Sequence, residues 1–371
     1  MNQKPKVSII TVCRNSVETI EQTIQSVLNQ TYTNIEYIVI DGASDDGTCD
    51  VIENYKAKLG YYCSEPDNGI YHAMNKGLQH TTGDIIGILN SDDWYTENAV
   101  ENVVKAFLQY DCEMVHGKLA MVYEENRIRV VEERNLEDLY IGMVVSHPTV
   151  FLKKSIYQQY GLFDEQYRSA ADYELMLRLY TKGVSIRFVP EILTFFRRGG
   201  FSEKATLLNA QETLGVSEKY IKAMKGQDKE ELLQRALDTY KEKEYRFRIG
   251  HTISTLSEHE KEEVVRKITS QRPVIVFGTG MYGYLCYELL DKLSVELLAW
   301  ADNDSRKQGD RILDILVYPP DRIFKGEYKI IISSPKYESE MISQLKKMGF
   351  SDTDYMTYTD MEKVIIGYES K

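Results

Sequence analysis

Residues 83–94 read Gly-Asp-Ile-Ile-Gly-Ile-Leu-Asn-Ser-Asp-Asp-Trp, and the N-terminal half of the chain is organised around this stretch. Its apolar run, residues 85–89, follows a Gly-Asp turn signal and suits a strand buried on both faces better than a helix. The polar sequence Asn90-Ser91-Asp92-Asp93 then falls just beyond the strand's carboxyl end, where open α/β sheets bind ligands. Adjacent carboxylates repel each other unless a cation lies between them, so a divalent ion is one interpretation. A solvated turn before a helix capped by Thr96 is equally consistent with this stretch alone.

The composition is that of an ordinary protein of about two domains, with 371 residues, 43% hydrophobic and 27% charged. A formal charge of −12 argues against nonspecific nucleic-acid binding, which needs an excess of Lys and Arg. The five cysteines form no C-x-x-C pair, which favours buried thiols in a reducing compartment. With no apolar signal region and no run of 18 apolar residues, we expect a cytoplasmic protein.

The first 60 residues predict a parallel βαβ unit. A strand at residues 7–12 is followed by Ser16 as a helix cap, apolar residues at helical spacing up to Leu28, and a second strand at residues 35–40. Asp41 ends that second strand, where a carboxylate commonly accepts hydrogen bonds from a nucleoside. Taken by itself, Asp41 is better explained by the turn that follows it.

A loop shaped by Pro66, Asn68 and Gly69 leads into a helix that contains Lys76, whose ammonium group could neutralise a phosphate. Residues 97–110 predict a helix, and residues 114–131 predict antiparallel strands with a turn at 124–126. The sequence contains no G-x-x-x-x-G-K-[ST] phosphate loop. The pattern is therefore a nucleotide-binding α/β unit of a different kind.

A series of short motifs, weak one by one, becomes specific through order and spacing. They are Val7-Ser8-Ile9-Ile10-Thr11, Gln30-Thr31-Tyr32, Asp41-Gly42 through Asp46-Gly47-Thr48, Asp67-Asn68-Gly69-Ile70-Tyr71, Met74-Asn75-Lys76-Gly77, Leu89-Asn90-Ser91-Asp92-Asp93, His147-Pro148-Thr149, Gly161-Leu162-Phe163-Asp164-Glu165 and Ala171-Asp172-Tyr173-Glu174-Leu175. The chain in this respect resembles family-two glycosyltransferases of GT-A fold, especially those that build bacterial surface polysaccharides. The resemblance extends over roughly residues 5–205.

The resemblance implies a nucleotide-sugar donor site and a bound Mg²⁺ or Mn²⁺. It assigns the nucleoside base to Asp41, the nucleotide pocket to Asp67, and the metal to Asp92 within the D-x-D element. Asn90 departs from that element by replacing its first carboxylate, although its amide oxygen can still contact ribose. The remaining donor-side positions are Thr11, Asn75, Lys76, Ser91 and Asp93.

The motif that usually ends in Glu-Asp before a helix is Ala171-Asp172 here, so the resemblance makes Asp172 the general base of an inverting transfer. From the residues alone, Asp172 is better explained as the N-cap of a helix over residues 173–180. His147 lines the acceptor cleft or packs at a strand end. Arg197 and Arg198 precede a glycine-containing loop, which either closes on the diphosphate or is a solvated turn.

The second half begins with a charge-dense segment that predicts packed helices with breaks at Gly226 and Gly250. A strand at residues 273–277 then leads into a G-x-G-x-x-G turn, and an acidic residue follows the next strand at ribose-binding spacing. These second-domain positions are Gly278, Gly280, Gly283 and Asp302. After the next strand the sequence indicates only one further strand, 328–333, and one helix, 338–348. This part resembles small Rossmann-like domains appended to polysaccharide-biosynthesis enzymes, and a purely structural glycine turn is the alternative.

We therefore expect an α/β protein with a GT-A domain at residues 1–205, a helical connector at 206–271 and a smaller Rossmann-like parallel domain at 272–371. The expected function is inverting, metal-dependent sugar transfer from a UDP-sugar to a hydroxyl of a glycan or lipid-linked oligosaccharide. The expected location is the cytoplasm or the inner face of the cell membrane, with at most peripheral membrane contact and the oligomeric state left open. The alternatives are a nucleotide-sugar oxidoreductase acting through the second domain, or a binding module.

Overall fold

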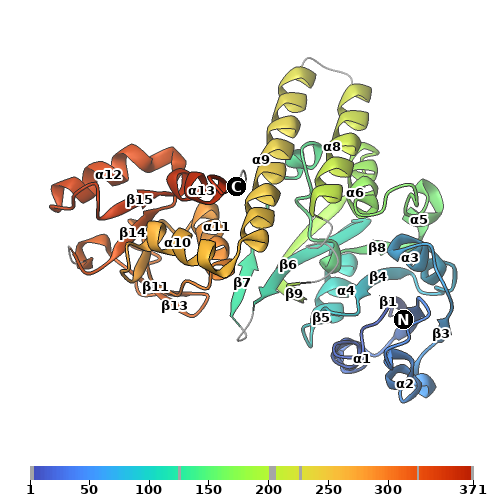
Figure 1. The fold of residues 1–371 in the computed structure, drawn as a ribbon. Coiled ribbons are helices and arrows are strands. Elements are labelled where there is room, and N and C mark those ends of the chain that lie inside the picture. Colours follow the sequence, from blue (N-terminus) through green and yellow to red (C-terminus); the bar gives the residue numbers. More distant parts are fainter. Residues whose placement is uncertain (1–3, 124–126, 200–205, 225–227, 324–325, 369–371) are drawn as a thin grey trace. The chain divides into compact units, whose positions relative to one another are not determined.

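The computed structural model describes residues 4–123, 127–199, 206–224, 228–323 and 326–368 (Figure 1). The chain divides into two compact units, Met1–Lys243 and Glu244–Lys371, each described by itself below. Within the described ranges, no helix has the length and apolar character needed to span a membrane.

The first unit is built on a mixed sheet whose strands run in the order β3-β2-β1-β4-β8-β6-β9-β5. Its first four strands are parallel to one another, as the sequence predicts: β1 (Val7–Cys13), β2 (Ile35–Asp41), β3 (Tyr61–Ser64) and β4 (Ile85–Asn90). Cys13 is level with Asp41 on β2, and Val12 is level with Asn90 on β4. The polar residues that follow β2 and β4 therefore lie at the same edge of the sheet.

The other half of the sheet comes from later in the chain. Its strands are β5 (Trp94–Tyr95), β6 (Met114–Val122), β7 (Ile128–Val131), β8 (Phe151–Lys153) and β9 (Ile186–Arg197). β8 runs antiparallel to β4, and β9 runs parallel to β6. β6 and β7 are antiparallel, as predicted, while the turn predicted at residues 124–126 lies outside the described residues.

Helices cover both faces of this sheet (Figure 1), namely α1 (Ile20–Leu28), α2 (Thr48–Glu53), α3 (Ile70–Gln79), α4 (Ala99–Gln109), α5 (Lys154–Tyr160) and α6 (Ala171–Thr181). Alternate residues of the central strands bury on opposite faces, which is why these strands read as continuous apolar runs. Two glycines allow close packing across the layers. A Cβ on Gly77 would lie 2.4 Å from Ile10 Cγ2, and a Cβ on Gly87 would lie 2.5 Å from Phe151 Cε1.

The sequence places two helix starts too early. α1 begins at Ile20 rather than after Ser16, because the Ser16 carbonyl accepts from the Thr19 and Ile20 amides in a preceding turn. α4 begins at Ala99, with Asn98 at the N-cap position. Thr96 is not the cap, because its hydroxyl donates to the Ile192 carbonyl of β9 at 2.9 Å. Both side chains are used for tertiary contacts instead of capping.

The segment predicted as a helical connector is helical, with α8 (Thr206–Ala223), α9 (Lys229–Thr255) and α10 (Glu258–Thr269). The division between the two units falls inside α9. The break predicted at Gly250 is wrong, since α9 continues through it while Ile249 and Ile253 on either side are buried. Packing of those neighbours offsets the ~1 kcal/mol that glycine costs in a helix. Gly226 lies outside the described residues.

The second unit has a smaller sheet with strand order β12-β13-β11-β10-β14-β15. The strands are β10 (Val274–Phe277), β11 (Leu297–Ala301), β12 (Arg311–Ile312), β13 (Ile315–Tyr318), β14 (Lys329–Ile332) and β15 (Tyr355–Thr357), parallel except for the β12–β13 pair. Its helices include α11 (Met281–Lys292), α12 (Glu338–Lys347) and α13 (Tyr358–Ile366). The prediction that the chain ends after one more strand and helix is wrong, because β15 and α13 follow. Strands of two to four residues show too little periodicity to be read from sequence.

Candidate active site

The polar residue that ends β4 and the carboxylate at the start of α6 meet at one cavity of about 170 Å³ in the first unit. Asn90 and Asp172 both line it. The other lining residues come from β7, β9 and the segment between β7 and β8, and they are Val131, Arg134, Met143, Val144, Val145, Ser146, His147, Pro148 and Phe196. Apolar and polar side chains line it in nearly equal numbers, so the cavity offers both packing surface and hydrogen-bonding groups to a ligand.

Asp172 lies in the first turn of α6, not before it. The N-cap position belongs to Ala170, so the interpretation of Asp172 as the cap is wrong. A carboxylate in a helix's first turn is stabilised by the positive end of the helix dipole. The side chain is partly exposed at the cavity, and its Oδ1 accepts a hydrogen bond of 2.9 Å from the Tyr71 hydroxyl. Asp172 is thus an anchored carboxylate with access to a ligand.

His147 combines the two interpretations that the sequence left open. It is only 8% exposed and packs edge-on against Phe163, with 5.7 Å between the ring centroids. It also lines the cavity that contains Asp172. Burial lowers the pKa of His147, while the negative charge of Asp172 acts in the opposite direction. At neutral pH the cavity wall therefore carries a neutral imidazole.

Asn90, the last residue of β4, and the two residues after it differ sharply in their surroundings. Asn90 Oδ1 is buried and has no hydrogen-bond partner among the described residues. The Ser91 hydroxyl lies 2.8 Å from that of Ser16, and its carbonyl accepts from Thr23 at 2.9 Å. Asp92 is partly exposed. Asn90 and Asp92 are therefore the two members of this sequence whose oxygens are best placed for a ligand.

Asp93 is not exposed at all, and the structure does not bring it to the cavity. Its Oδ1 accepts a hydrogen bond of 3.2 Å from the Arg197 backbone amide, which ties the end of β4 to the end of β9. Its Oδ2 has no partner among the described residues. Burial and then the charge of Asp92 raise the pKa of Asp93 well above its ordinary value. The donor-binding role predicted for Asp93 conflicts with this placement.

The carboxylates do not form a closed metal site. Among the described residues, no three His, Cys, Asp or Glu side chains are grouped to hold an ion. The partly exposed Asp92, with the unpartnered Asn90 oxygen nearby in sequence, provides an incomplete set of hard oxygen ligands. Such a set fits Mg²⁺ or Mn²⁺ that arrives with diphosphate oxygens, since Mg²⁺ is usually held by one or two carboxylates plus substrate phosphates.

Asp41, at the end of β2, is completely buried and hydrogen-bonded by the chain itself. Ser44 donates through its amide and hydroxyl, Ser64 Oγ donates at 2.6 Å, and the thiols of Cys13 and Cys49 lie at 3.4 and 3.3 Å. Burial alone would raise the pKa of Asp41, but these donors together lower it. The side chain therefore stays ionised and shapes the turn after β2, as the residue-level interpretation expects.

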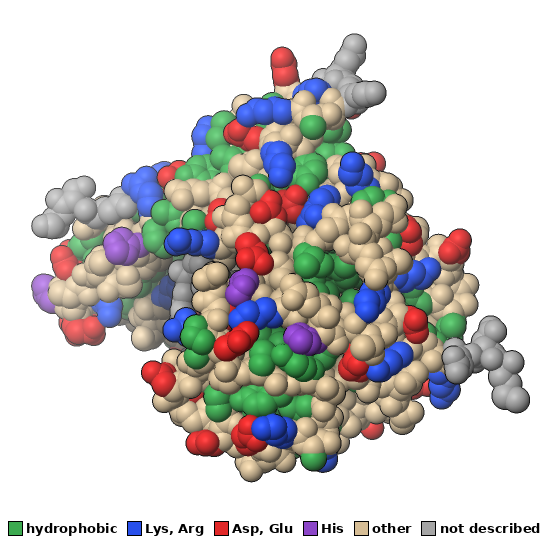
Figure 2. All heavy atoms as spheres, turned by 90° about the vertical axis from the view of Figure 1, so that its right-hand side faces the viewer, with side chains coloured by type: hydrophobic (Ala, Val, Ile, Leu, Met, Phe, Trp, Pro, Cys, Tyr) green, Lys and Arg blue, Asp and Glu red, His purple; other side chains and the backbone are tan. Residues whose placement is uncertain are grey.

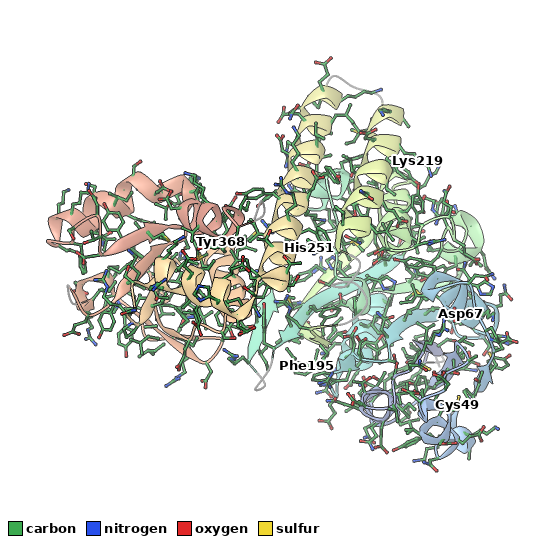
Figure 3. All side chains as sticks on the ribbon, viewed as in Figure 1. Cys49, Asp67, Phe195, Lys219, His251 and Tyr368 are labelled. Carbon is green, nitrogen blue, oxygen red and sulfur yellow. The ribbon has the colours of Figure 1, made fainter. Side chains whose placement is uncertain are left out.

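Asp67 lies beside this turn and is partly exposed (Figure 3). A Cβ on Gly42 would lie 2.5 Å from Asp67 Oδ2, so only glycine allows the carboxylate to approach the end of β2 so closely. Asp67 Oδ1 accepts a hydrogen bond of 2.8 Å from the Gly69 amide. Asp67 is the more accessible of the two carboxylates assigned to the nucleotide.

Three predicted donor-side residues have structural partners elsewhere. Thr11 is buried within β1, and its hydroxyl accepts from Tyr37 at 3.0 Å. Asn75 on α3 bonds the backbone N–H and C=O of Phe163 and also Glu165 Oε1. Lys76 pairs with Glu65 at 2.9 Å and reaches the Pro66 carbonyl. The structure brings neither Thr11 nor Asn75 to the cavity, because their polar atoms hold the protein together.

Arg197 ends the long strand β9, and Arg198 follows it. The Arg197 guanidinium lies 5.0 Å from the Trp94 ring centroid and donates to Gln22 Oε1 at 2.6 Å. The Arg198 guanidinium lies 4.8 Å from the ring centroid of Tyr123. Most of the loop predicted to follow, residues 200–205, lies outside the described residues. Figure 2 shows basic and acidic side chains intermingled on the face in view, without a continuous basic patch for nucleic acid.

Sequence reasoning missed two kinds of site residue. Tyr71 stands in the quoted motif of residues 67–71, but no residue pattern shows that its hydroxyl reaches Asp172, a hundred positions later. The apolar wall formed by Met143, Val144 and Val145 belongs to a segment for which no element was predicted. Only the fold brings these residues together.

In the second unit, the glycine turn is closed by contacts within the chain. A Cβ on Gly283 would lie 2.3 Å from the Gly278 carbonyl oxygen, and Gly278 itself has φ +106°. Asp302 accepts from the amide and hydroxyl of Thr279, and these bonds, against the effect of burial, lower its pKa. The carboxylate predicted to bind ribose therefore holds the turn. Gly280 has open space around it.

A larger hollow of about 670 Å³ in this unit is lined mainly by α12 residues rather than by the glycine turn. No described contact in the second unit favours the oxidoreductase alternative.

Comparison with known proteins identifies families and relatives that this chain resembles. Residues 8–182 match the family model described as glycosyl transferase family 2, and residues 270–356 match one described as C2185-like, N-terminal. The uncharacterized glycosyltransferase MT1564 of Mycobacterium tuberculosis is 33% identical over 196 residues, which are 51% of this chain and 75% of that protein. The hyaluronan synthase of Pasteurella multocida is 30% identical over 200 residues, 49% of this chain and 19% of that enzyme.

The fold has solved counterparts as well. The crystal structure of S. aureus TarS 1-349 in complex with UDP-GlcNAc superposes with a TM-score of 0.53 at 18% identity, covering 70% of this chain and 78% of that one. This likeness confirms the GT-A-like fold of the N-terminal unit. Together with the family match and the relatives, it makes this chain an enzyme, and the chain belongs to glycosyltransferase family 2.

Proposed function

We propose that the first unit transfers a sugar from a UDP-sugar to a hydroxyl of a glycan or lipid-linked oligosaccharide, with inversion at the anomeric carbon and with Asp172 as general base. The observation that carries this proposal is the shared cavity of Asn90 and Asp172. This cavity contains both the end of β4, where the family holds its donor, and a carboxylate that can take a proton.

The proposed reaction is one displacement. Asp172 accepts the proton of the acceptor hydroxyl while that oxygen forms a bond to the anomeric carbon. The bond from the anomeric carbon to the diphosphate breaks on the opposite side, so the configuration inverts. Burial lowers the pKa of His147 on the same wall, which makes its imidazole a weaker base than an exposed histidine.

The donor side is assigned to Asp67, Asn90 and Asp92. Asp67 is the accessible carboxylate beside Gly42, and we assign the nucleoside to it together with the turn that Asp41 shapes. Asp92 would hold Mg²⁺ or Mn²⁺ jointly with the donor. A divalent ion bound there would stabilise the charge that develops on the leaving diphosphate. A UDP-sugar is favoured because the TarS neighbour was solved with UDP-GlcNAc.

The acceptor side is assigned to the remaining wall of the cavity. Its apolar residues and the exposed Arg134 suit a sugar ring with a polar substituent. The relative named as a hyaluronan synthase supports a glycan as the acceptor class.

A screen of nucleotide sugars tests this function. The purified chain is incubated with UDP-, GDP- and dTDP-sugars, with and without Mn²⁺, and release of the nucleoside diphosphate is measured. We expect release from a UDP-sugar in the presence of Mn²⁺, loss with EDTA, and a fall of about 100-fold or more in Asp92→Ala. Equal rates with and without EDTA would overturn the metal role. Release from GDP-sugars alone would overturn the assignment of UDP.

A further inference from the structure

Tyr71 is a buried tyrosine in the first turn of α3, and nothing in the proposed reaction yet uses it. It is 7% exposed, and its ring stacks on Phe163 with 5.7 Å between centroids. Its hydroxyl donates to Asp172 Oδ1 at 2.9 Å. Burial and the neighbouring Asp172 charge raise the pKa of Tyr71 far above its ordinary value. The phenol therefore keeps its proton and donates a hydrogen bond to the carboxylate, while backbone hydrogen bonds from Ala171 and Asp172 act on its pKa in the opposite direction.

This bond has a geometric consequence for Asp172. A carboxylate on a partly exposed side chain can rotate about its terminal torsion, which has a broad energy profile. A donor fixed by the packing of α3 and Phe163 holds Oδ1 and so sets the plane of the carboxylate. Oδ2 is then the atom presented to an acceptor hydroxyl.

The placement of Tyr71 also links the two sides of the site. Only Ile70 separates it from residues 67–69, in which Asp67 approaches the end of β2 beside Gly42. One short segment thus carries the carboxylate assigned to the donor and the hydroxyl bonded to the base. A shift of this segment changes both positions together.

We propose that Tyr71 is a positioning residue that orients Asp172 through its hydroxyl, so that the acceptor proton is transferred to Oδ2. The proposal rests on the assignment of Asp172 as general base. It concerns orientation and charge stabilisation, since Tyr71 itself touches no reacting atom.

The test compares Tyr71→Phe with Tyr157→Phe. Tyr157 is buried in the same apolar cluster and also packs on Phe163, with centroids 6.4 Å apart, so it controls for loss of a hydroxyl from this core. For Tyr71→Phe we expect kcat to fall about 10- to 100-fold with an unchanged KM for the donor. Tyr157→Phe should behave as wild type in both measurements.

The outcomes distinguish a failure of this proposal from a failure of the assignment of Asp172 as general base, on which it rests. If Asp172→Asn loses turnover while Tyr71→Phe matches Tyr157→Phe in kcat and in the KM for the donor, Asp172 stays the base and the role of Tyr71 is overturned. If Asp172→Asn turns over normally, the proposed function fails first, whatever Tyr71→Phe does. A fall in melting temperature together with a rise in the donor KM, in place of a fall in kcat alone, would mark Tyr71 as merely structural and would also overturn the proposal.

Discussion

Replacing Asn75 by alanine separates a structural role from a donor-binding one. The side chain is 6% exposed and is hydrogen-bonded to both backbone groups of Phe163, at 3.0 and 3.1 Å, and to Glu165 at 2.8 Å. Phe163 is itself buried, so its N–H and C=O would lose their protein partners. We expect Asn75→Ala to destabilise the first unit without changing donor affinity.

The magnitude follows from the two backbone bonds. Each contributes about 1–1.5 kcal/mol net, which gives about 2–3 kcal/mol in total, with the more exposed Glu165 contact left out. For a unit of this size, the melting temperature should fall by roughly 4–12 °C. Differential scanning calorimetry of the whole chain measures this change, and the KM for the donor should stay within about twofold of wild type.

Asn54→Ala is the matched control, because Asn54 is an exposed asparagine at the end of α2 with helical dihedral angles. It should leave the melting temperature within about 1–2 °C of wild type. The reasoning would be refuted if Asn75→Ala melted like Asn54→Ala while its KM for the donor rose tenfold. That result would restore Asn75 to the donor site.

Three further predictions follow from buried groups. Asp93 has a raised pKa, so the folded state becomes less stable as pH rises above the ordinary carboxyl range. We therefore expect the free energy of unfolding of Asp93→Asn to exceed that of wild type by about 1 kcal/mol or more at pH 8 and to equal it near pH 3. Lower stability of Asp93→Asn at pH 8 would contradict this. Burial lowers the pKa of His116 from 6.5 to about 4, so its contribution is complete above pH 6.5 and is lost as pH falls towards 4, by roughly 3 kcal/mol. Urea unfolding at pH 7 and pH 4.5 should show a smaller loss in His116→Leu, and an equal loss would argue against a buried neutral histidine. In the second unit, Gly283→Ala should unfold the domain because its Cβ would meet the Gly278 oxygen, whereas Gly280→Ala should keep the wild-type melting temperature. Loss of binding to a nucleotide or phosphate in a stable Gly280→Ala protein would revive a ligand role for the glycine turn.

Much of the fold is readable from the sequence because its central strands are short β-branched runs that end in polar clusters. Residues 85–89 predict β4 for this reason, and the strand register then puts Asp41 and Asn90 at one edge. Helix starts are less readable, because Ser16 and Thr96 can cap a helix or make tertiary bonds, and only the fold decides between them. Strands as short as β15 leave no periodic signal.

The sequence predicts some residues of the candidate site and misses others for a physical reason. A motif gives the type of each residue, but the burial of a side chain decides whether it can contact a ligand. Asp92 and Asp93 are the same residue type, yet Asp92 is partly exposed, while Asp93 is buried and accepts a hydrogen bond from the Arg197 amide at the end of β9. Tyr71 and Asp172 show the converse, since their hydrogen bond joins distant segments that no local pattern connects.

The most direct test of the account measures donor binding and turnover on the same preparation of Asp172→Asn. Asparagine keeps the size of the side chain and can still accept the Tyr71 hydrogen bond, but it cannot take a proton. Calorimetric titration with UDP and Mn²⁺ should give a Kd within about threefold of wild type, while transfer falls by about 100-fold to 10,000-fold. Near-normal transfer by Asp172→Asn, with UDP binding intact, would contradict the role assigned to this carboxylate.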